Sequence, residues 1–291
     1  MKYQIQSDNL QVTLDSNGAG ITSIIRDGAE YLWQADPEYW SGQAPVMFPI
    51  CGCLRGGEAD LLNGKKVRLD RHGFARRRDF IVKEQKADEV TYELVSDEET
   101  MKAYPFPFIF QMNYKVVDNC LSINHIVTNT GDETMPYFIG GHPAFFCPMK
   151  EGERFEDYVV EMEVPEYANC PLISPSGELL DEKRTLYFDN ESVLSLEHHL
   201  FYHDALCLEY PKSTYAILRH KDSEHGVRVD FEGFDFFQIW SSANDGPFVA
   251  LEPWTGTATT SIEDDIFEHK RGVKLLEPGK TETTTYSISI V

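Results

Sequence analysis

Two neighbouring stretches decide the fold: FIFQMNYKV at residues 108–116 and CLSINHIVTN at residues 120–129. In both, polar and apolar side chains alternate, which is the pattern of a β-strand with one buried face. Asp118 and Asn119 lie between them and favour a tight turn. The two stretches therefore predict an antiparallel β-hairpin.

His125 lies inside the second of these strands. It alternates in phase with Leu121, Ile123 and Val127, so its side chain is expected to point toward the core. We interpret it as a structural core histidine. A place in a functional site is the alternative.

Similar segments recur from one end of the chain to the other. Strands are expected in residues 3–34, 61–69, 90–95, 158–164, 227–231, 236–242 and 283–291, with turn residues between them. One short helix is expected at residues 97–104, and the acidic region 151–200 reads as looser strands and turns. Strands at intervals of about 8–12 residues predict an all-β protein, a large antiparallel β-sandwich with few short helices. We expect residues 1–291 to form a single domain.

The composition restricts the function. The 291 residues include 26 Lys and Arg against 48 Asp and Glu, a formal net charge of −22. This balance argues against nucleic acid or an anionic membrane as a partner, because both require basic surface. No segment approaches the roughly 18 consecutive apolar residues of a membrane span. The first eight residues are polar and alternating, unlike a signal peptide.

Six cysteines are scattered through the chain, at positions 51, 53, 120, 147, 170 and 207. Most lie in apolar runs, which is typical of reduced, buried thiols in a cytoplasmic protein. Cys51 and Cys53 form a C-x-C pair, but no second pair or histidine cluster at ligand spacing accompanies them. We therefore expect neither a metal nor another cofactor.

The first candidate for chemistry lies in the apolar stretch MPYFIGGHPAFFCP, residues 135–148. Two glycines precede His142 and a proline follows it. Glycine permits positive φ or a close approach to a ligand, and proline restricts the residue before it. A histidine held there is a candidate proton-transfer group. A structural histidine is the alternative.

The second candidate is Glu252, in the stretch ALEPWTGT at residues 250–257. A carboxylate between Leu251 and Pro253, beside Trp254, is costly to bury without a partner. Burial would raise its pKa toward neutrality, as a general base requires. The alternative is a glutamate that forms an ion pair at a strand end.

Three further positions carry polar groups suited to a ligand. Arg55 ends an apolar run beside two glycines, which indicates either a ligand clamp or a salt bridge at a strand end. His72 and Arg76 belong to the densest cationic cluster, residues 71–80, for which a solvated turn is the alternative. Asp204 precedes an apolar strand. An aspartate there is most often a turn residue, and a ligand contact is the alternative.

Four motifs, in chain order, resemble those of the aldose 1-epimerase family, the galactose mutarotase-like proteins. They are CLRG at 53–56, HGFAR at 72–76, GGHPAF at 140–145 and LEPW at 251–254. The match is closest to the LacX-type branch of small bacterial members. The resemblance implies the family's β-supersandwich, with the site on the concave face of a broad curved sheet.

Carried over position by position, the resemblance assigns His142 as general acid and Glu252 as general base. It implies that Arg55 and His72 hold sugar hydroxyls or the ring oxygen, and that Asp204 binds substrate. The implied reaction interconverts the α and β anomers of a free aldohexose. Its partner would be a small sugar, and the protein would be a monomer or a homodimer.

Two other functions remain open. In the first, the substrate is a hexose 6-phosphate and Arg76, with Arg55, clamps its phosphate. In the second, the protein only binds carbohydrate, with Trp240, Trp254 and Phe145 stacked on sugar faces. A glycosidase is disfavoured, because the buried carboxylate lacks an acidic partner in a comparable setting.

Overall fold

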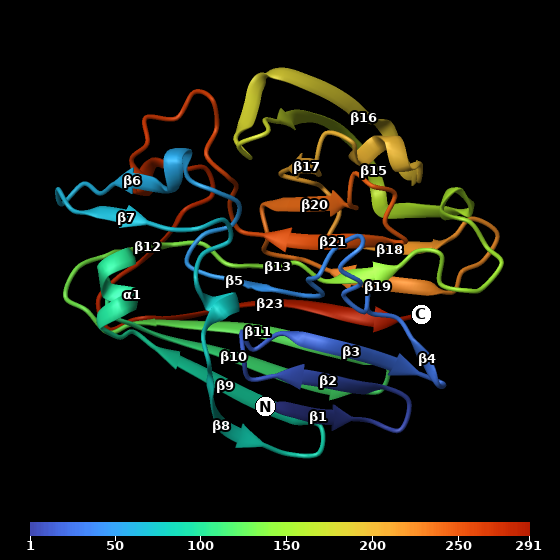
Figure 1. Cartoon of the computed structure of the whole chain (residues 1–291), viewed down its shortest axis with the longest axis horizontal. Helices are drawn as coiled ribbons and strands as arrows, with labels where there is room; N and C mark the ends of the chain where they lie inside the picture. The colour runs from blue at the N-terminus through green and yellow to red at the C-terminus, as the bar shows by residue number, and fades with distance from the viewer.

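The largest element of the computed structural model, which describes residues 1–291, is a nine-stranded antiparallel sheet (Figure 1). Its strands are β8 (Ile81–Gln85), β9 (Glu89–Val95), β10 (Phe108–Val117), β11 (Cys120–Asn129), β15 (Tyr158–Ile173), β16 (Leu179–Ser195), β18 (Tyr215–His220), β19 (Gly226–Asp230) and β23 (Thr281–Ile290). Their order across the sheet is β16-β15-β18-β19-β23-β11-β10-β9-β8.

A second sheet, of six strands, packs against the first. It contains β5 (Val46–Met47), β13 (Gly140–Gly141), β14 (Ala144–Phe146), β17 (Leu206–Glu209), β20 (Phe236–Trp240) and β21 (Phe248–Trp254). The order is β17-β20-β21-β13-β5, and β14 also pairs with β21. This sheet carries Glu252 on β21, and His142 lies between β13 and β14.

Smaller elements complete the structure. Strands β1 (Lys2–Gln6), β2 (Gln11–Asp15), β3 (Ile21–Arg26) and β4 (Ala29–Glu30) form a meander that contacts β9 and β10, and two ribbons pair β6 (Glu58–Asp60) with β7 (Lys66–Arg68) and β12 (Met135–Tyr137) with β22 (Lys274–Leu276). Short 3₁₀ turns are η1 (Arg55–Gly57), η2 (Ala75–Arg77), η3 (Phe155–Asp157), η4 (His198–Phe201) and η5 (Phe267–His269).

The only α-helix is α1 (Glu98–Ala103). It begins at Asp97, whose carboxylate accepts the backbone N–H groups of Glu99 and Thr100 at 3.0 and 2.8 Å. Such a cap satisfies donors that the first turn leaves unpaired. The predicted all-β fold with few short helices is confirmed, and the helix lies where the sequence indicated it.

The hairpin that decides the fold forms as predicted. Strands β10 and β11 pair antiparallel with Tyr114 opposite Ile123, and the buried side chains alternate along both strands. Because the side-chain period of a strand is two, this register places the buried side chains of both strands on the same face. That face supplies one side of the main hydrophobic core.

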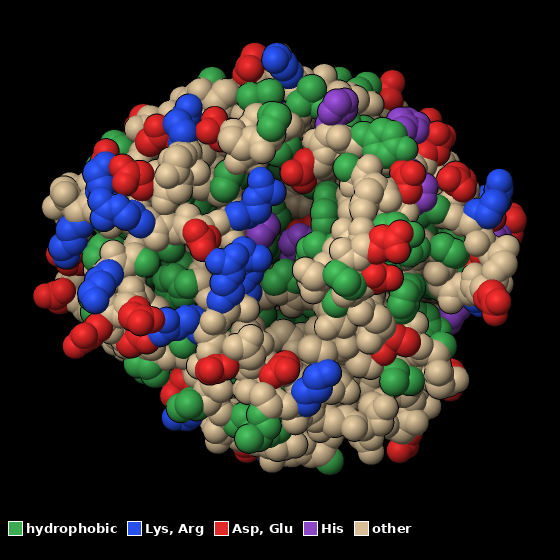
Figure 2. Space-filling view, in the orientation of Figure 1, with side chains coloured by type: hydrophobic (Ala, Val, Ile, Leu, Met, Phe, Trp, Pro, Cys, Tyr) green, Lys and Arg blue, Asp and Glu red, His purple; other side chains and the backbone are tan.

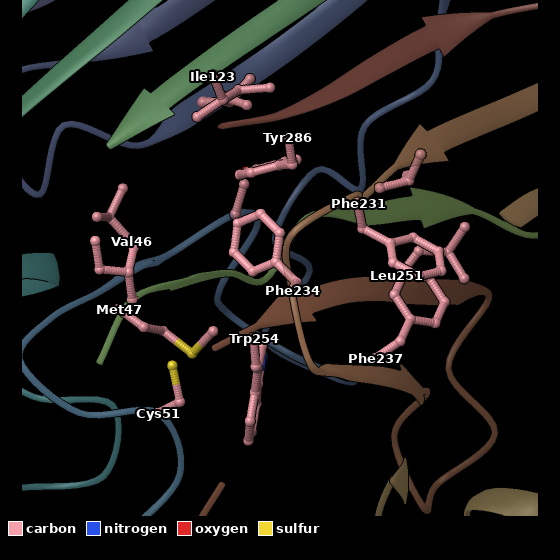
Figure 3. Close-up of a cluster of buried hydrophobic side chains, with 14 of the residues drawn as sticks. Val46, Met47, Cys51, Ile123, Phe231, Phe234, Phe237, Leu251, Trp254 and Tyr286 are labelled. Carbon is pink, nitrogen blue, oxygen red and sulfur yellow. The ribbon is translucent and has the colours of Figure 1, made fainter. Parts of the chain in front are cut away.

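The core lies between the two large sheets. Figure 3 shows Ile123 and Tyr286 of the nine-stranded sheet approaching Phe237 and Leu251 of the six-stranded sheet. The largest apolar cluster contains 70 buried residues and runs from Ile5 to Ile290. Contacts within this core hold the six-stranded sheet in a fixed orientation against the nine-stranded sheet. The opposite face of the six-stranded sheet is therefore turned away from the core.

The region 158–195 differs from the expectation of loose strands and turns. It forms a long hairpin of two strands, β15 and β16, with 16 and 17 residues, and lies at the top of the view in Figure 1. Several register shifts interrupt the pairing. These bulges disturb the alternation of polar and apolar residues. The sequence pattern therefore predicted shorter strands than the structure contains. We call residues 163–191 the arm.

His125 is fully buried, as predicted for a core histidine. Its ring stacks with that of Tyr286 at a centroid distance of 5.6 Å, and its Nδ1 lies 3.3 Å from the carbonyl oxygen of Thr284. Burial lowers its pKa to about 3, because the charged form would lose its hydration.

This shift predicts acid sensitivity of folding. An unfolded histidine binds a proton below about pH 6.5 but the folded His125 does not, so stability falls as the pH drops from 6.5 toward 3. By pH 5 this one group removes about 2 kcal/mol of unfolding free energy. Urea unfolding of wild type and His125→Leu at pH 7.5 and 5.0 should show a loss smaller by about that amount in the variant. The exposed His199→Gln should behave like wild type; equal losses in all three proteins would contradict the prediction.

Candidate active site

A cavity of about 250 Å³ opens on the face of the six-stranded sheet that points away from the core. Figure 2 shows the hollow, with histidine side chains at its bottom and Lys and Arg side chains along one side. Strands β17, β20 and β21 line its floor, and residues from the arm and from the turn before β17 line its walls. Of the predicted site residues, five line it: His72, Arg76, His142, Asp204 and Glu252.

The alternation of β21 places Glu252 in the cavity. Leu251 and Pro253 face one side of the strand, and Glu252 and Trp254 face the other. Gln238 of β20 stands directly opposite Glu252 in the antiparallel register, so the two side chains share a face. Strand β21 therefore covers the core with one face and directs the Glu252 carboxyl group into the cavity from the other.

His142 reaches the same place from a different part of the chain. The segment around it is tied to β21 by backbone hydrogen bonds on both sides: Leu251 N–H donates to Pro143 O at 3.1 Å, and Thr255 N–H donates to Ile139 O at 2.9 Å. The Thr255 hydroxyl also accepts the Ile139 N–H at 2.9 Å. These hydrogen bonds bring together the side chains of His142 and Glu252, which lie far apart in the sequence.

The glycines before His142 have a different role from the one expected. Neither Gly140 nor Gly141 has a positive φ, and both are buried. A Cβ on Gly140 would collide with the side chain of Met47, and one on Gly141 with the ring of Tyr286. The sequence needs glycine here for close packing of β13 on the core.

The pair His142 and Glu252 forms the centre of the site. His142 Nε2 lies 3.3 Å from Glu252 Oε2, and both residues are almost completely buried, with 7% and 1% exposure. The indole N–H of Trp254 donates to the same carboxylate oxygen at 3.2 Å. One oxygen therefore faces both an imidazole and a fixed donor.

Burial sets the protonation of this pair. It raises the pKa of Glu252 well above the usual value, and the neighbouring Asp204 charge raises it further, whereas the Trp254 donor opposes the shift. Burial, with smaller contributions from the cations Arg76 and Arg71, lowers the pKa of His142 to about 3. Both shifts favour the uncharged forms, a carboxylic acid beside a neutral imidazole. At 3.3 Å, His142 Nε2 and Glu252 Oε2 lie just beyond the usual hydrogen-bond distance, and the buried Nδ1 of His142 has no partner.

Aromatic rings enclose the imidazole. Trp40 stacks on His142 with ring centroids 4.9 Å apart and an interplanar angle of 24°. Trp240 meets it edge-on at 5.3 Å. The rings exclude water from the histidine, and the face of Trp40 is placed to favour the imidazolium when a proton arrives.

His72 lies beside the pair as a fixed donor. Its Nδ1 accepts the backbone N–H of Gly52 at 3.1 Å, so its proton is carried on Nε2. Its ring lies edge-on to His142 at 5.5 Å and to Trp254 at 5.4 Å. Burial and the nearby His142, Arg76 and Arg71 lower its pKa well below the usual value. His72 is therefore a neutral N–H donor.

Two arginines and an aspartate line the cavity. Arg71 Nη1 lies 3.6 Å from Asp204 Oδ2, and Asp204 has a positive φ of 80° with its other oxygen accepting the Ala205 N–H at 2.8 Å. Arg76 donates to the backbone oxygen of Arg71 at 2.8 Å, but its buried Nε has no partner. These groups supply both donors and an acceptor to a polar ligand.

Arg55 is the predicted site residue that the structure does not bring to the cavity. Its Nε lies 3.0 Å from Asp265 Oδ1, and its Nη2 donates to Thr260 O at 2.8 Å. Glu178 Oε2 lies 3.8 Å from its Nη1. Of the two readings of Arg55, the geometry matches the salt bridge.

Several further residues line the cavity, and three of them, which the motifs did not indicate, bear on ligand binding. Gln238 is buried opposite Glu252 and donates to Cys207 Sγ at 3.1 Å; Arg71 and Trp40 are the others. Gln238 could have been found from its place in an apolar strand, where an amide needs a partner. Arg71 lies in the cationic cluster but outside the HGFAR motif, and Trp40 lies in a turn-rich region with no motif.

No group of three or more His, Cys, Asp or Glu side chains is arranged to hold a metal ion. No helix combines the length and the apolar character that crossing a bilayer requires.

The site combines a buried imidazole and a buried carboxyl group, 3.3 Å apart, at the bottom of a polar and aromatic cavity on a β-sandwich. The sequence model of the family described as aldose 1-epimerase matches residues 1–289. The chain belongs to the aldose 1-epimerase family, whose members are isomerases that act on sugars.

Relatives with known sequences or structures agree with this assignment. Protein LacX of Lactococcus lactis subsp. lactis is 40% identical over 298 residues, covering 100% of both chains. A galactose mutarotase related enzyme from Lactobacillus acidophilus superposes with a TM-score of 0.94 at 35% identity, over 100% of this chain and 97% of that one. A galactose mutarotase-like protein from Lactobacillus casei gives 0.87 at 26% identity, over 100% of each. The predicted LacX-type membership is confirmed.

Proposed function

We propose that this protein is an aldose 1-epimerase that interconverts the α and β anomers of a free aldohexose. The observation that carries the proposal is the 3.3 Å contact between His142 and Glu252 at the floor of the cavity. Ring opening requires that the anomeric O–H lose a proton while the ring oxygen gains one. A base and an acid side by side can perform both transfers without a covalent intermediate.

The proposed cycle uses one proton that stays within the pair. In the unliganded protein the proton rests on Glu252. Transfer to His142 gives a carboxylate, which Trp254 stabilises, and an imidazolium. The carboxylate then takes the proton of the anomeric hydroxyl, while His142 protonates the ring oxygen. After rotation about C1–C2, the reverse transfers close the ring on the other face and restore the pair.

The remaining cavity residues would bind the hydroxyl groups. His72 offers its Nε2–H, Asp204 an acceptor, and Arg71 and Arg76 offer donors. Trp240 provides an apolar surface for a sugar face. We assign Arg71, rather than Arg55, to direct contact with the sugar, because Arg71 lines the cavity and Arg55 does not.

A second candidate substrate is a hexose 6-phosphate. Two arginines, Arg71 and Arg76, line one cavity in a protein of net charge −22. Guanidinium groups recognise phosphate well. Competitive inhibition of mutarotation by inorganic phosphate, weakened in Arg76→Gln, would support this substrate.

Polarimetry tests the proposal. Freshly dissolved α-D-glucose and α-D-galactose are followed with and without protein, and glucose 6-phosphate is tested in parallel. Acceleration of a free sugar supports the first candidate, and acceleration of the phosphate ester alone supports the second. If the protein accelerates none of them, mutarotation is refuted for these substrates, and a carbohydrate-binding role becomes the alternative.

The cellular setting is also a proposal. All six cysteines are free, and five of them are buried. These free thiols support a reducing compartment, and we propose the cytoplasm. That the chain forms a single domain stays a prediction, which scanning calorimetry can test. That it is a monomer or a homodimer is another, which sedimentation analysis can test.

A further inference from the structure

Three segments of the chain meet behind one wall of the cavity. They are residues 53–55, residues 174–179 at the tip of the arm, and residues 257–261. The Thr259 N–H donates to Cys53 O at 2.8 Å, the Leu179 N–H donates to Thr259 O at 3.0 Å, and the Ser261 N–H donates to Leu179 O at 2.8 Å. Gly177, Leu179, Thr257 and Ala258 from these segments line the cavity.

Arg55 joins the same three segments through its side chain. It starts from the first segment, binds the carbonyl of Thr260 and the carboxylate of Asp265, and faces Glu178 of the arm. Its side chain is 37% exposed and lies outside the cavity lining. A planar guanidinium with several donors is suited to such a junction.

The arm tip in turn packs on Arg71. Gly177 has a φ of +92°, and a Cβ at this position would collide with Nη2 of Arg71 and crowd Cys53 Sγ. The backbone of the tip therefore lies directly against the guanidinium. Apart from Asp204 at 3.6 Å, no charged side chain holds Arg71. The tip therefore bounds one side of the space that the Arg71 guanidinium occupies.

We propose that Arg55 is a positioning residue, which fixes the arm tip against residues 257–261 and thereby places Arg71 for the substrate. The kinetic consequence rests on the proposed function, whereas the effect on the arm tip does not. Because the ion pairs are partly exposed, the effect is moderate.

The test compares Arg55→Gln with Asp265→Asn. Asp265 has a positive φ of 62°, which asparagine tolerates, so the second variant removes the ionic partner without a change in backbone preference. Arg68→Gln is the matched control, since Arg68 is an exposed arginine that pairs with Glu58. Hydrogen exchange of residues 174–182 should be faster in both test variants and unchanged in the control.

With the sugar that wild type accelerates, both test variants should raise KM by about 3–5-fold and leave kcat within about twofold. The double variant should be no worse than Arg55→Gln alone, because Asp265→Asn removes an ion pair that Arg55→Gln has already removed. If Arg55 touched the sugar itself, Arg55→Gln alone would raise KM, with unchanged exchange at the arm tip. If wild type accelerates no sugar, the proposed function fails, while the exchange data still decide whether Arg55 holds the tip.

Discussion

Glu252→Gln is expected to lower kcat for mutarotation by about 10²–10⁴-fold, because the variant has no group that can take the anomeric proton. KM should change little, since glutamine keeps the shape of the side chain and can still face Trp254. Initial rates by polarimetry, at several concentrations of the preferred sugar, separate the two parameters. A variant that keeps more than a tenth of the wild-type kcat would contradict the assignment of Glu252 as the base.

Loss of folding would not explain that result. The raised pKa of Glu252 means that wild type loses stability as the pH rises above about 4.5, because the unfolded carboxyl ionises and the folded one resists ionisation. Glutamine removes this penalty, so the variant should be at least as stable as wild type at pH 7.5. The exposed Glu277→Gln is the control and should match wild type in rate.

His142→Gln is expected to lower kcat by a similar factor, about 10²–10⁴-fold, by removing the acid that protonates the ring oxygen. The double variant with Glu252→Gln should be about as slow as the slower single variant, because the two residues share one proton and act as a unit. A double variant whose loss equals the product of the two single losses would contradict the shared-proton cycle. Initial rates by polarimetry at saturating sugar make the comparison.

The fold was largely predictable because its main signals are local. Strands β10 and β11 alternate without interruption, so the period of two identified both of them and placed His125 inward. The arm was harder to predict, since its register shifts break that period and much of its surface is exposed. Alternation of polar and apolar residues identifies a strand only when one of its faces is buried, and much of the arm has little buried face.

The site was predictable only in part, for a similar reason. His142 and Glu252 were identified from short motifs, and the fold brings them into contact. The different positions of Arg55 and Arg71 could not be predicted, because both are arginines near glycines and only the placement of residues 174–179 and 257–261 separates them. Gln238 depends on the register between β20 and β21, which is a property of the folded sheet.

The indole rings around His142 give the protein an optical property. The chain has four tryptophans; Trp40, Trp240 and Trp254 line the cavity, and Trp33 donates its indole N–H to the backbone oxygen of Trp40 at 2.8 Å. Tryptophan fluorescence therefore originates in and beside the cavity. A sugar that displaces water from these rings should shift the emission, so titrations can rank ligands independently of turnover, even for variants that no longer catalyse.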